Sequence, residues 1–76
     1  MNKARRKELD KLRDKLEEVK SELEMLANAE RDSYDNMPES LQQGERGTQS
    51  EAAADALDNA VSSLDDAISS VDEAVS

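Results

Sequence analysis

Residues 57–76 consist of Leu57-Asp-Asn-Ala-Val-Ser-Ser, Leu64-Asp-Asp-Ala-Ile-Ser-Ser and Val71-Asp-Glu-Ala-Val-Ser, which is one seven-residue pattern repeated. Large apolar residues recur in it at alternating intervals of four and three, as on the contact side of a coiled-coil helix. This seam contains Leu57, Val61, Leu64, Ile68, Val71 and Val75. A stripe of small residues runs beside the seam and would let another helix approach closely, so we predict an oligomer interface there: Ala53, Ala60, Ala67 and Ala74.

The same spacing occurs in the N-terminal part of the chain. Its large apolar residues follow one another at intervals of 3, 4, 3, 4 and 3: Leu9, Leu12, Leu16, Val19, Leu23 and Leu26. The residues between them are mostly Lys, Arg, Glu and Asp, which suit the solvent-facing side of a helix. The spacing predicts one helix over about residues 2–33.

The segment of residues 34–47 separates the two heptad regions and differs from them in composition. It holds the only proline, Pro38, both glycines and the only aromatic residue, Tyr34. Proline suits the first turn of a helix and glycine the position after its end, so we predict a turn with a short helix that ends near Gln43, with Gly44 in the left-handed conformation. The larger side chains of the segment are expected to plug this closed end: Tyr34, Met37 and Leu41.

A capping box marks the expected start of the second long helix. Thr48 is followed three residues later by Glu51. In this motif the hydroxyl and the carboxylate each satisfy a free backbone N–H at a helix N-terminus. We therefore predict a helix over about residues 48–76.

The two heptad regions match each other in antiparallel register. Antiparallel pairing requires residue numbers that add to a constant, and seam pairs such as Leu16 with Ile68 and Val19 with Leu64 add to 83 or 84 throughout. The predicted fold is all-α, a two-helix antiparallel coiled-coil hairpin that forms one domain over residues 1–76. This register also sets opposite charges side by side at the flanking positions: Arg13 beside Asp72 and Lys20 beside Asp65.

Such a hairpin is too small to bury its own seams completely. It has 76 residues and no cysteine, so no disulfide compensates for a thin core. Each helix has one neighbour, which leaves about half of each seam open to water. We expect a homo-oligomer, namely a dimer of hairpins that forms a four-helix bundle closed by the alanine stripe; a hairpin combined with a foreign helix is the alternative.

The composition argues against several functional classes. The chain has no His, no Cys and no glycine-rich phosphate loop, and its seams are aliphatic, so we predict neither an enzyme nor a metal or cofactor site. No stretch approaches the roughly 18 consecutive apolar residues that span a bilayer. The first seven residues lead into no apolar segment, so we expect a cytoplasmic protein without a membrane role.

Charge is distributed unevenly along the chain. Residues 1–20 carry eight basic and five acidic side chains, and no basic residue follows Gly47. Direct binding to nucleic acid is not expected, because phosphate binding relies on clustered Lys and Arg. The acidic side chains of the second long helix form either a solvated face or a phosphate-like array that binds a nucleic-acid-binding protein: Asp55, Asp58, Asp65, Asp66, Asp72 and Glu73.

The turn has the least regular surface and is the candidate site for a ligand or partner. A tyrosine ring and two guanidinium groups would suit a nucleotide-like anionic small molecule, particularly where two turns meet in an oligomer. The alternative is that these charges form only local ion pairs with Glu30, Asp32 and Glu45. The candidate residues are Arg31, Tyr34, Asn36, Glu39, Gln42 and Arg46.

The turn motif Tyr34-Asp-Asn-Met-Pro-Glu-Ser-Leu-Gln, with Gly44-Glu-Arg-Gly after it, resembles a group of small uncharacterised proteins of bacteriophages and prophages. The resemblance extends over about residues 30–76 and includes the acidic heptad helix. It implies a short helical hairpin protein of phage origin and transfers no functional residue. Small acidic phage proteins often bind and block a host protein, so the resemblance implies such a role, for example against a defence protein.

Three functional hypotheses follow. The first is an oligomeric helical interaction protein that binds, and in doing so inhibits, a host protein. The second is a protein that sequesters a nucleotide-like anion at its turns. The third is an acidic nucleic-acid mimic that acts as a decoy for a basic partner.

Overall fold

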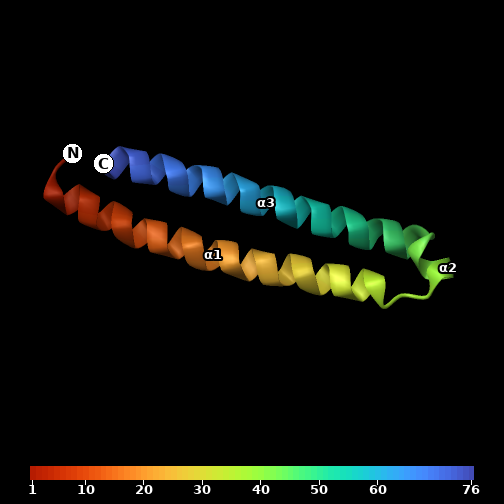
Figure 1. Ribbon diagram of the computed structural model, residues 1–76. Helices are drawn as coiled ribbons and strands as arrows, with labels where there is room; N and C mark the ends of the chain where they lie inside the picture. The colour runs from red at the N-terminus through yellow and green to blue at the C-terminus, as the bar shows by residue number, and fades with distance from the viewer.

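The computed structural model describes all 76 residues and shows a long helical hairpin (Figure 1). Three helices follow one another: α1 (Lys3–Asp35), α2 (Glu39–Gln42) and α3 (Glu45–Val75). The long helices α1 and α3 lie side by side and antiparallel, the short α2 lies at the closed end, and both termini lie at the open end. The Cα trace measures 58 × 14 × 13 Å. The predicted all-α hairpin is confirmed.

Local sequence explains both ends of α1. At its start, the side chain of Asn2 accepts a hydrogen bond of 2.8 Å from the backbone N–H of Arg5, which satisfies one of the free donors of the first helical turn. After its end, Pro38 prevents the chain from continuing as a helix. α1 therefore extends to Asp35, two residues beyond the end that the heptad spacing predicted.

α3 starts three residues earlier than the capping motif predicted. Gly44 is its N-cap, with φ −91° and ψ −172°, and Glu45 is its first residue. Thr48 lies inside the helix, where its hydroxyl donates to the carbonyl oxygen of Gly44 at 3.1 Å. The predicted capping box of Thr48 and Glu51 and the predicted left-handed Gly44 are therefore wrong. Extended backbone at Gly44 takes the chain from α2 directly into α3, so neither a left-handed residue nor a later cap is needed.

Gly47 is the point at which α2 contacts α3. A Cβ atom at this position would lie 2.0 Å from the carbonyl oxygen of Gln42 and 2.6 Å from its Cα. Gly47 is buried, and a residue without a side chain is the one that lets two backbones approach this closely. Of the three residues expected to plug this end, Tyr34 and Met37 are half-buried, whereas Leu41 is 40% exposed. Backbone contact at Gly47 thus contributes to the closed end together with side-chain packing.

Small residues build the core next to the turn. Ala27 on α1 is 1% exposed, and Ala54 and Ser50 on α3 are 3% and 4% exposed. The hydroxyl of Ser50 lies 2.8 Å from a carboxylate oxygen and 3.2 Å from the backbone carbonyl oxygen of Glu30, which satisfies this buried polar group. The two long helices are therefore tied together directly beside the turn.

The heptad seam continues from this core to the open end. Ile68 is its best-covered member, at 5% exposure, and the other seam residues of α3 are half-buried. The predicted register is confirmed by the two predicted ion pairs between the helices: Arg13 with Asp72 and Lys20 with Asp65.

Replacing Gly47 by alanine tests the close contact at the turn. We expect Gly47→Ala to lower the free energy of unfolding by about 1–3 kcal/mol, because the new methyl group must displace backbone atoms of α2. Gly44→Ala is the matched control, because its Cβ would lie 3.5 Å from the nearest atom, in ordinary contact. Thermal unfolding followed by circular dichroism at one protein concentration measures both, and equal melting temperatures for the two variants would contradict the contact.

Leu16→Asp tests the seam. Leu16 is half-buried between the helices, and a carboxylate there removes apolar packing from the seam and loses part of its hydration, which costs more than about 2 kcal/mol. We expect this variant to lose most of its helical circular dichroism at room temperature. Ser21→Asp places the same charge on the exposed side of α1 and should keep it. Full helicity in Leu16→Asp would disprove the proposed pairing.

Candidate interaction surfaces

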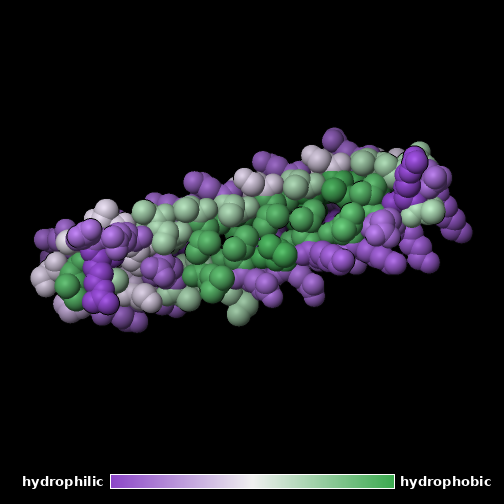
Figure 2. Space-filling model, turned by 180° about the vertical axis from the view of Figure 1, so that it is seen from behind, coloured by the Kyte–Doolittle hydropathy of each residue, from purple (hydrophilic) through white to green (hydrophobic).

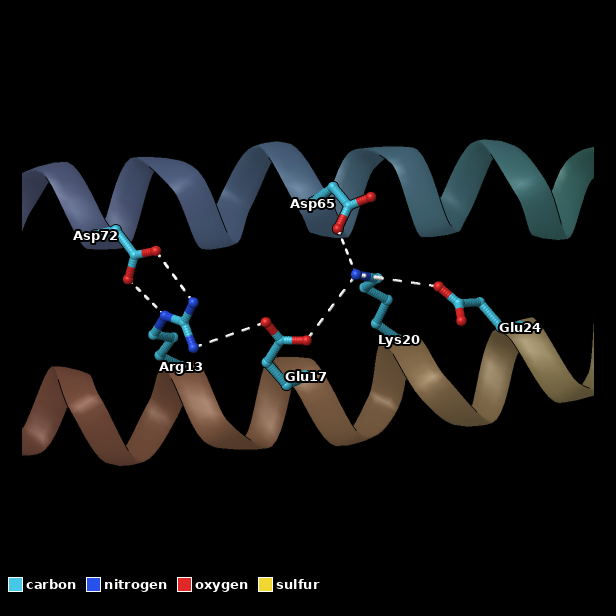
Figure 3. Close-up of polar contacts among 6 residues, drawn as sticks. All are labelled: Arg13, Glu17, Lys20, Glu24, Asp65 and Asp72. Atoms are coloured by element: carbon cyan, nitrogen blue, oxygen red, sulfur yellow. Dashed lines mark hydrogen bonds and ion pairs between the residues drawn. The ribbon is translucent and has the colours of Figure 1, made fainter.

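One side of the α1–α3 pair is bridged by ion pairs (Figure 3). The guanidinium group of Arg13 donates to both carboxylate oxygens of Asp72, with Nη2 3.1 Å from Oδ2. Nζ of Lys20 lies 2.7 Å from Oδ1 of Asp65. Glu17 lies between the two cations, 3.7 Å from Arg13 and 4.0 Å from Lys20. We call this surface the ion-pair face, and it consists of Arg13, Glu17, Lys20, Glu24, Asp65 and Asp72.

The ion-pair face selects the register more than it adds stability. The two inter-helix pairs have side chains between 22% and 55% exposed, and water screens the attraction of such exposed pairs, so they add little stability. Hydrogen bonding to Asp72 raises the pKa of Arg13, and hydrogen bonding to Asp65 raises the pKa of Lys20. Both cations are charged at neutral pH, so the pairs favour this alignment of α1 and α3 over shifted ones.

Arg31 forms a third ion pair between the long helices. Its guanidinium group contacts both carboxylate oxygens of Asp58, with Nη1 3.3 Å from Oδ1. The partner is therefore on α3, and not one of the neighbouring residues Glu30, Asp32 and Glu45 that the sequence suggested. Hydrogen bonding to Asp58 raises the pKa of Arg31. Arg31 joins α1 to α3, and this use of its guanidinium group competes with binding of a ligand.

The other turn candidates do not converge on one site. Gln42 donates its side-chain amide to the backbone carbonyl oxygen of Tyr34 at 2.9 Å, which closes the turn. Asn36, Glu39 and Arg46 are exposed, and none of the three lines the cavity beside the turn. Of the six candidates, only Arg31 and Tyr34 line this cavity.

The cavity beside the turn has a volume of about 310 Å³ and is bordered by more carboxylates than cations. Burial raises the pKa of the Tyr34 phenol, and the neighbouring carboxylate of Glu51 raises it further. Because Arg31 is the single basic residue in the lining and is already paired, this environment does not favour a nucleotide-like anion. The lining consists of Arg31, Tyr34, Asp35, Ser50, Glu51, Ala54 and Asp55.

The opposite side of the α1–α3 pair exposes hydrophobic side chains in a band along most of the hairpin (Figure 2). On α1, Leu12, Val19, Met25 and Leu26 are 42%, 45%, 70% and 58% exposed. A shallow groove of about 260 Å³ lies beside Met25 and Leu26. We call this surface the open face. It consists of these four residues, the half-buried seam residues of α3 on the same side and the alanine stripe: Leu57, Leu64, Val71, Ala53, Ala60, Ala67 and Ala74.

The alanine stripe borders the open face and not the ion-pair face. Ala53, Ala67 and Ala74 are exposed, and Ala60 is half-buried. In the heptad of α3 these alanines occupy the g positions, whereas the aspartates that pair with α1 occupy the e positions on the other side of the seam. The predicted oligomer interface thus lies on the surface that the hairpin leaves uncovered.

The heptad spacing predicted the seam but not which of its sides is open. On α1, the seam residues toward the ion-pair face are half-buried, whereas those toward the alanine stripe are exposed. The charges indicate the difference, because the e positions hold pairing charges and the g positions of α3 hold only alanine. The exposed seam residues of α1 are Leu12, Val19 and Leu26.

Tyr34 is the only tyrosine, so its titration can be followed directly by phenolate absorbance. We expect its midpoint above the ordinary value of about 10, because burial and Glu51 both disfavour the phenolate. Because the pKa of Tyr34 is raised in the folded state, the neutral phenol contributes to the free energy of unfolding. This contribution is fully present below the unfolded-state pKa and is lost as the pH rises through the folded-state pKa. Glu51→Gln should lower the midpoint without restoring the unfolded value, since burial is the larger cause. A midpoint equal to that in denaturant would contradict the burial of Tyr34.

Neither a metal site nor a bilayer-spanning helix is found. No group of three or more His, Cys, Asp or Glu side chains is arranged to hold a metal ion, and none of the helices combines the length and hydropathy needed to cross a membrane. Comparisons with protein families, with curated proteins and with solved structures find no match to this chain. The resemblance of the turn to small phage proteins stays a prediction.

Proposed function

We propose that this chain is a helical protein-interaction module and that a protein partner covers its open face. The observation that supports the proposal is the row of large apolar side chains on α1 that are 42% to 70% exposed. Soluble monomers rarely expose a contiguous apolar patch larger than a few hundred Å² without a partner that covers it. The row continues into the half-buried seam residues of α3, so the two long helices together form one binding surface.

The spacing of the open face suits a helical partner. Leu12, Val19 and Leu26 recur at seven-residue intervals, which is the repeat by which helices interlock in coiled coils and bundles. The alanine stripe along α3 has no bulky side chains, so the backbone of a partner helix can approach α3 closely. A helix that presents apolar residues at heptad spacing is therefore the kind of element that this surface fits.

Binding, and not catalysis, is the proposed activity. The chain lacks His and Cys, and the open face consists of aliphatic side chains and methionine beside charged flanks. Such a surface excludes water and supplies packing area, but it contains no group that would activate a nucleophile or transfer a proton. We propose no cofactor.

The resemblance of the turn to phage proteins extends the proposal to the partner. We propose that the partner is a host protein, met in the cytoplasm of the infected cell, and that binding inhibits it, as in an anti-defence role. The resemblance supports a host partner, and the exposed side chains support the binding surface.

An acidic decoy is the second candidate function. The observation in its favour is that α3 carries no basic residue after Arg46, so every charged side chain on its outward side beyond that residue is acidic. A decoy would bind a basic partner through that outward side, for example around Asp66, and the binding would weaken steeply with salt. The two candidates therefore differ in which surface of the hairpin is covered.

Site-specific photo-cross-linking in the host cell tests which surface is covered. A photoreactive side chain at Met25 lies on the open face, whereas the same group at Ser21 or Asp66 lies on an outward side of α1 or α3. All three positions are exposed, so substitution should leave the fold intact. We expect a covalent adduct with a protein from Met25 and none from Ser21.

The mass of the adduct identifies the partner. An adduct of twice the chain mass of 8.4 kDa contains a second copy, and any other mass contains a different protein. Adducts from Asp66 that disappear at high salt, with none from Met25, would replace the proposal by the decoy. Equal adducts from Met25 and Ser21 would contradict a defined binding surface.

A further inference from the structure

The size of the open face matches what a stable dimer needs. The Cα trace of the hairpin is 58 Å long and 14 Å wide, so one long side offers on the order of 800 Å², which is about the area that each partner buries in a specific interface. The open face is the side that the second copy must cover, because the other side of the seam is already bridged by ion pairs.

The apolar residues of the open face are arranged symmetrically about one level of the hairpin. In the antiparallel register of the seam Val19 lies opposite Leu64, next to the 2.7 Å ion pair of Lys20 with Asp65. On α1 the exposed seam residues lie seven residues before and seven after Val19, and on α3 the half-buried seam residues of the open face lie seven before and seven after Leu64. A twofold axis that crosses the long axis of the hairpin at this level places each row against the same row of a second copy, in reverse order. Leu12 of one copy then meets Leu26 of the other.

The charges that border the open face obey the same symmetry. Lys15 and Glu22 occupy g positions of α1 on either side of Val19, are exposed, and form no ion pair within the chain. When two α1 helices pack antiparallel about Val19, Lys15 of each copy lies beside Glu22 of the other, as antiparallel g positions require. The corresponding border of α3 carries no charge, and Ala60 of one copy meets Ala67 of the other.

Net charge selects the antiparallel arrangement over the parallel one. Residues 21–63 form the closed half of the hairpin and carry ten acidic and two basic side chains. Residues 1–20 and 64–76 form the open half and carry nine acidic and eight basic side chains. Parallel docking would bring two strongly negative closed halves together. Antiparallel docking separates them and sets each beside the nearly neutral open half of the other copy.

We infer that a second copy of this chain covers the open face, with the two hairpins antiparallel about a twofold axis at Val19 and Leu64. The inference rests on the open face of the proposed function and names its occupant in the isolated protein. In this dimer α1 packs against α1 and α3 against α3, all neighbouring helices are antiparallel, and two equivalent Lys15–Glu22 pairs border the interface. The closed ends point in opposite directions.

Thiol cross-linking of the purified protein tests the arrangement, since the chain has no native cysteine. Val19→Cys should form a disulfide, or a bridge through a short thiol-reactive linker, with itself across the axis. Leu12→Cys alone should not cross-link, but a mixture of Leu12→Cys with Leu26→Cys should. A parallel dimer would instead cross-link Val19→Cys with Leu64→Cys, and that result would overturn the inference.

A charge exchange gives a second test that leaves the seams untouched. Lys15→Glu and Glu22→Lys should each weaken dimerisation in sedimentation equilibrium by on the order of tenfold, because each places like charges together twice per dimer. The double variant should restore the affinity, and the helical circular dichroism of the dimeric forms should stay the same. A double variant as weak as the single ones would overturn the register.

The oligomeric state separates this inference from the proposed function. A single-chain mass for the unmodified protein at the concentrations used for NMR would overturn the second copy as occupant. It would leave the proposed function standing if Met25 still cross-links to another protein in cells. Absence of any position-dependent adduct from Met25, together with the single-chain mass, would overturn both.

Discussion

A helix with a single neighbour can bury only the side that faces that neighbour, and the rest of this structure depends on that constraint. α1 and α3 cover each other along one heptad seam, and α2 is too short to cover either of them. Ile68 is 5% exposed, whereas Leu12, Val19 and Leu26 are each at least 42% exposed. The chain therefore folds into a hairpin whose hydrophobic core is also part of its surface.

The two sides of the seam meet this constraint differently. On the ion-pair face, Lys and Arg side chains of α1 reach across the seam to aspartates of α3. On the open face, the alanines of α3 are too short to do so, and the seam residues of α1 stay in contact with water. The difference between a charged and an alanine flank thus makes one side of a regular coiled coil available for binding.

Periodicity was sufficient to predict the hairpin, its register and two of its ion pairs, because large apolar residues and complementary charges at heptad spacing have few alternatives. The core beside the turn was missed, since Ala27, Ser50 and Ala54 carry no strong apolar signal and become buried only because small residues let the helices approach. The start of α3 was placed too late because a capping motif at Thr48 is local, whereas the contact of Gly47 with α2 is tertiary. The turn candidates failed to converge for the same reason: spacing along the chain does not specify loop geometry.

The small-residue contact at the closed end also determines the order in which the hairpin can assemble. The hydrogen bond of Ser50 to Glu30 joins residues 20 apart, the Arg31–Asp58 pair spans 27, and the Arg13–Asp72 pair spans 59. The entropic cost of closing a loop rises with the length of that loop. Each contact made near the turn shortens the loop that the next contact must close. The two long helices therefore pair from the turn outward, and they separate first at the end where the two termini lie.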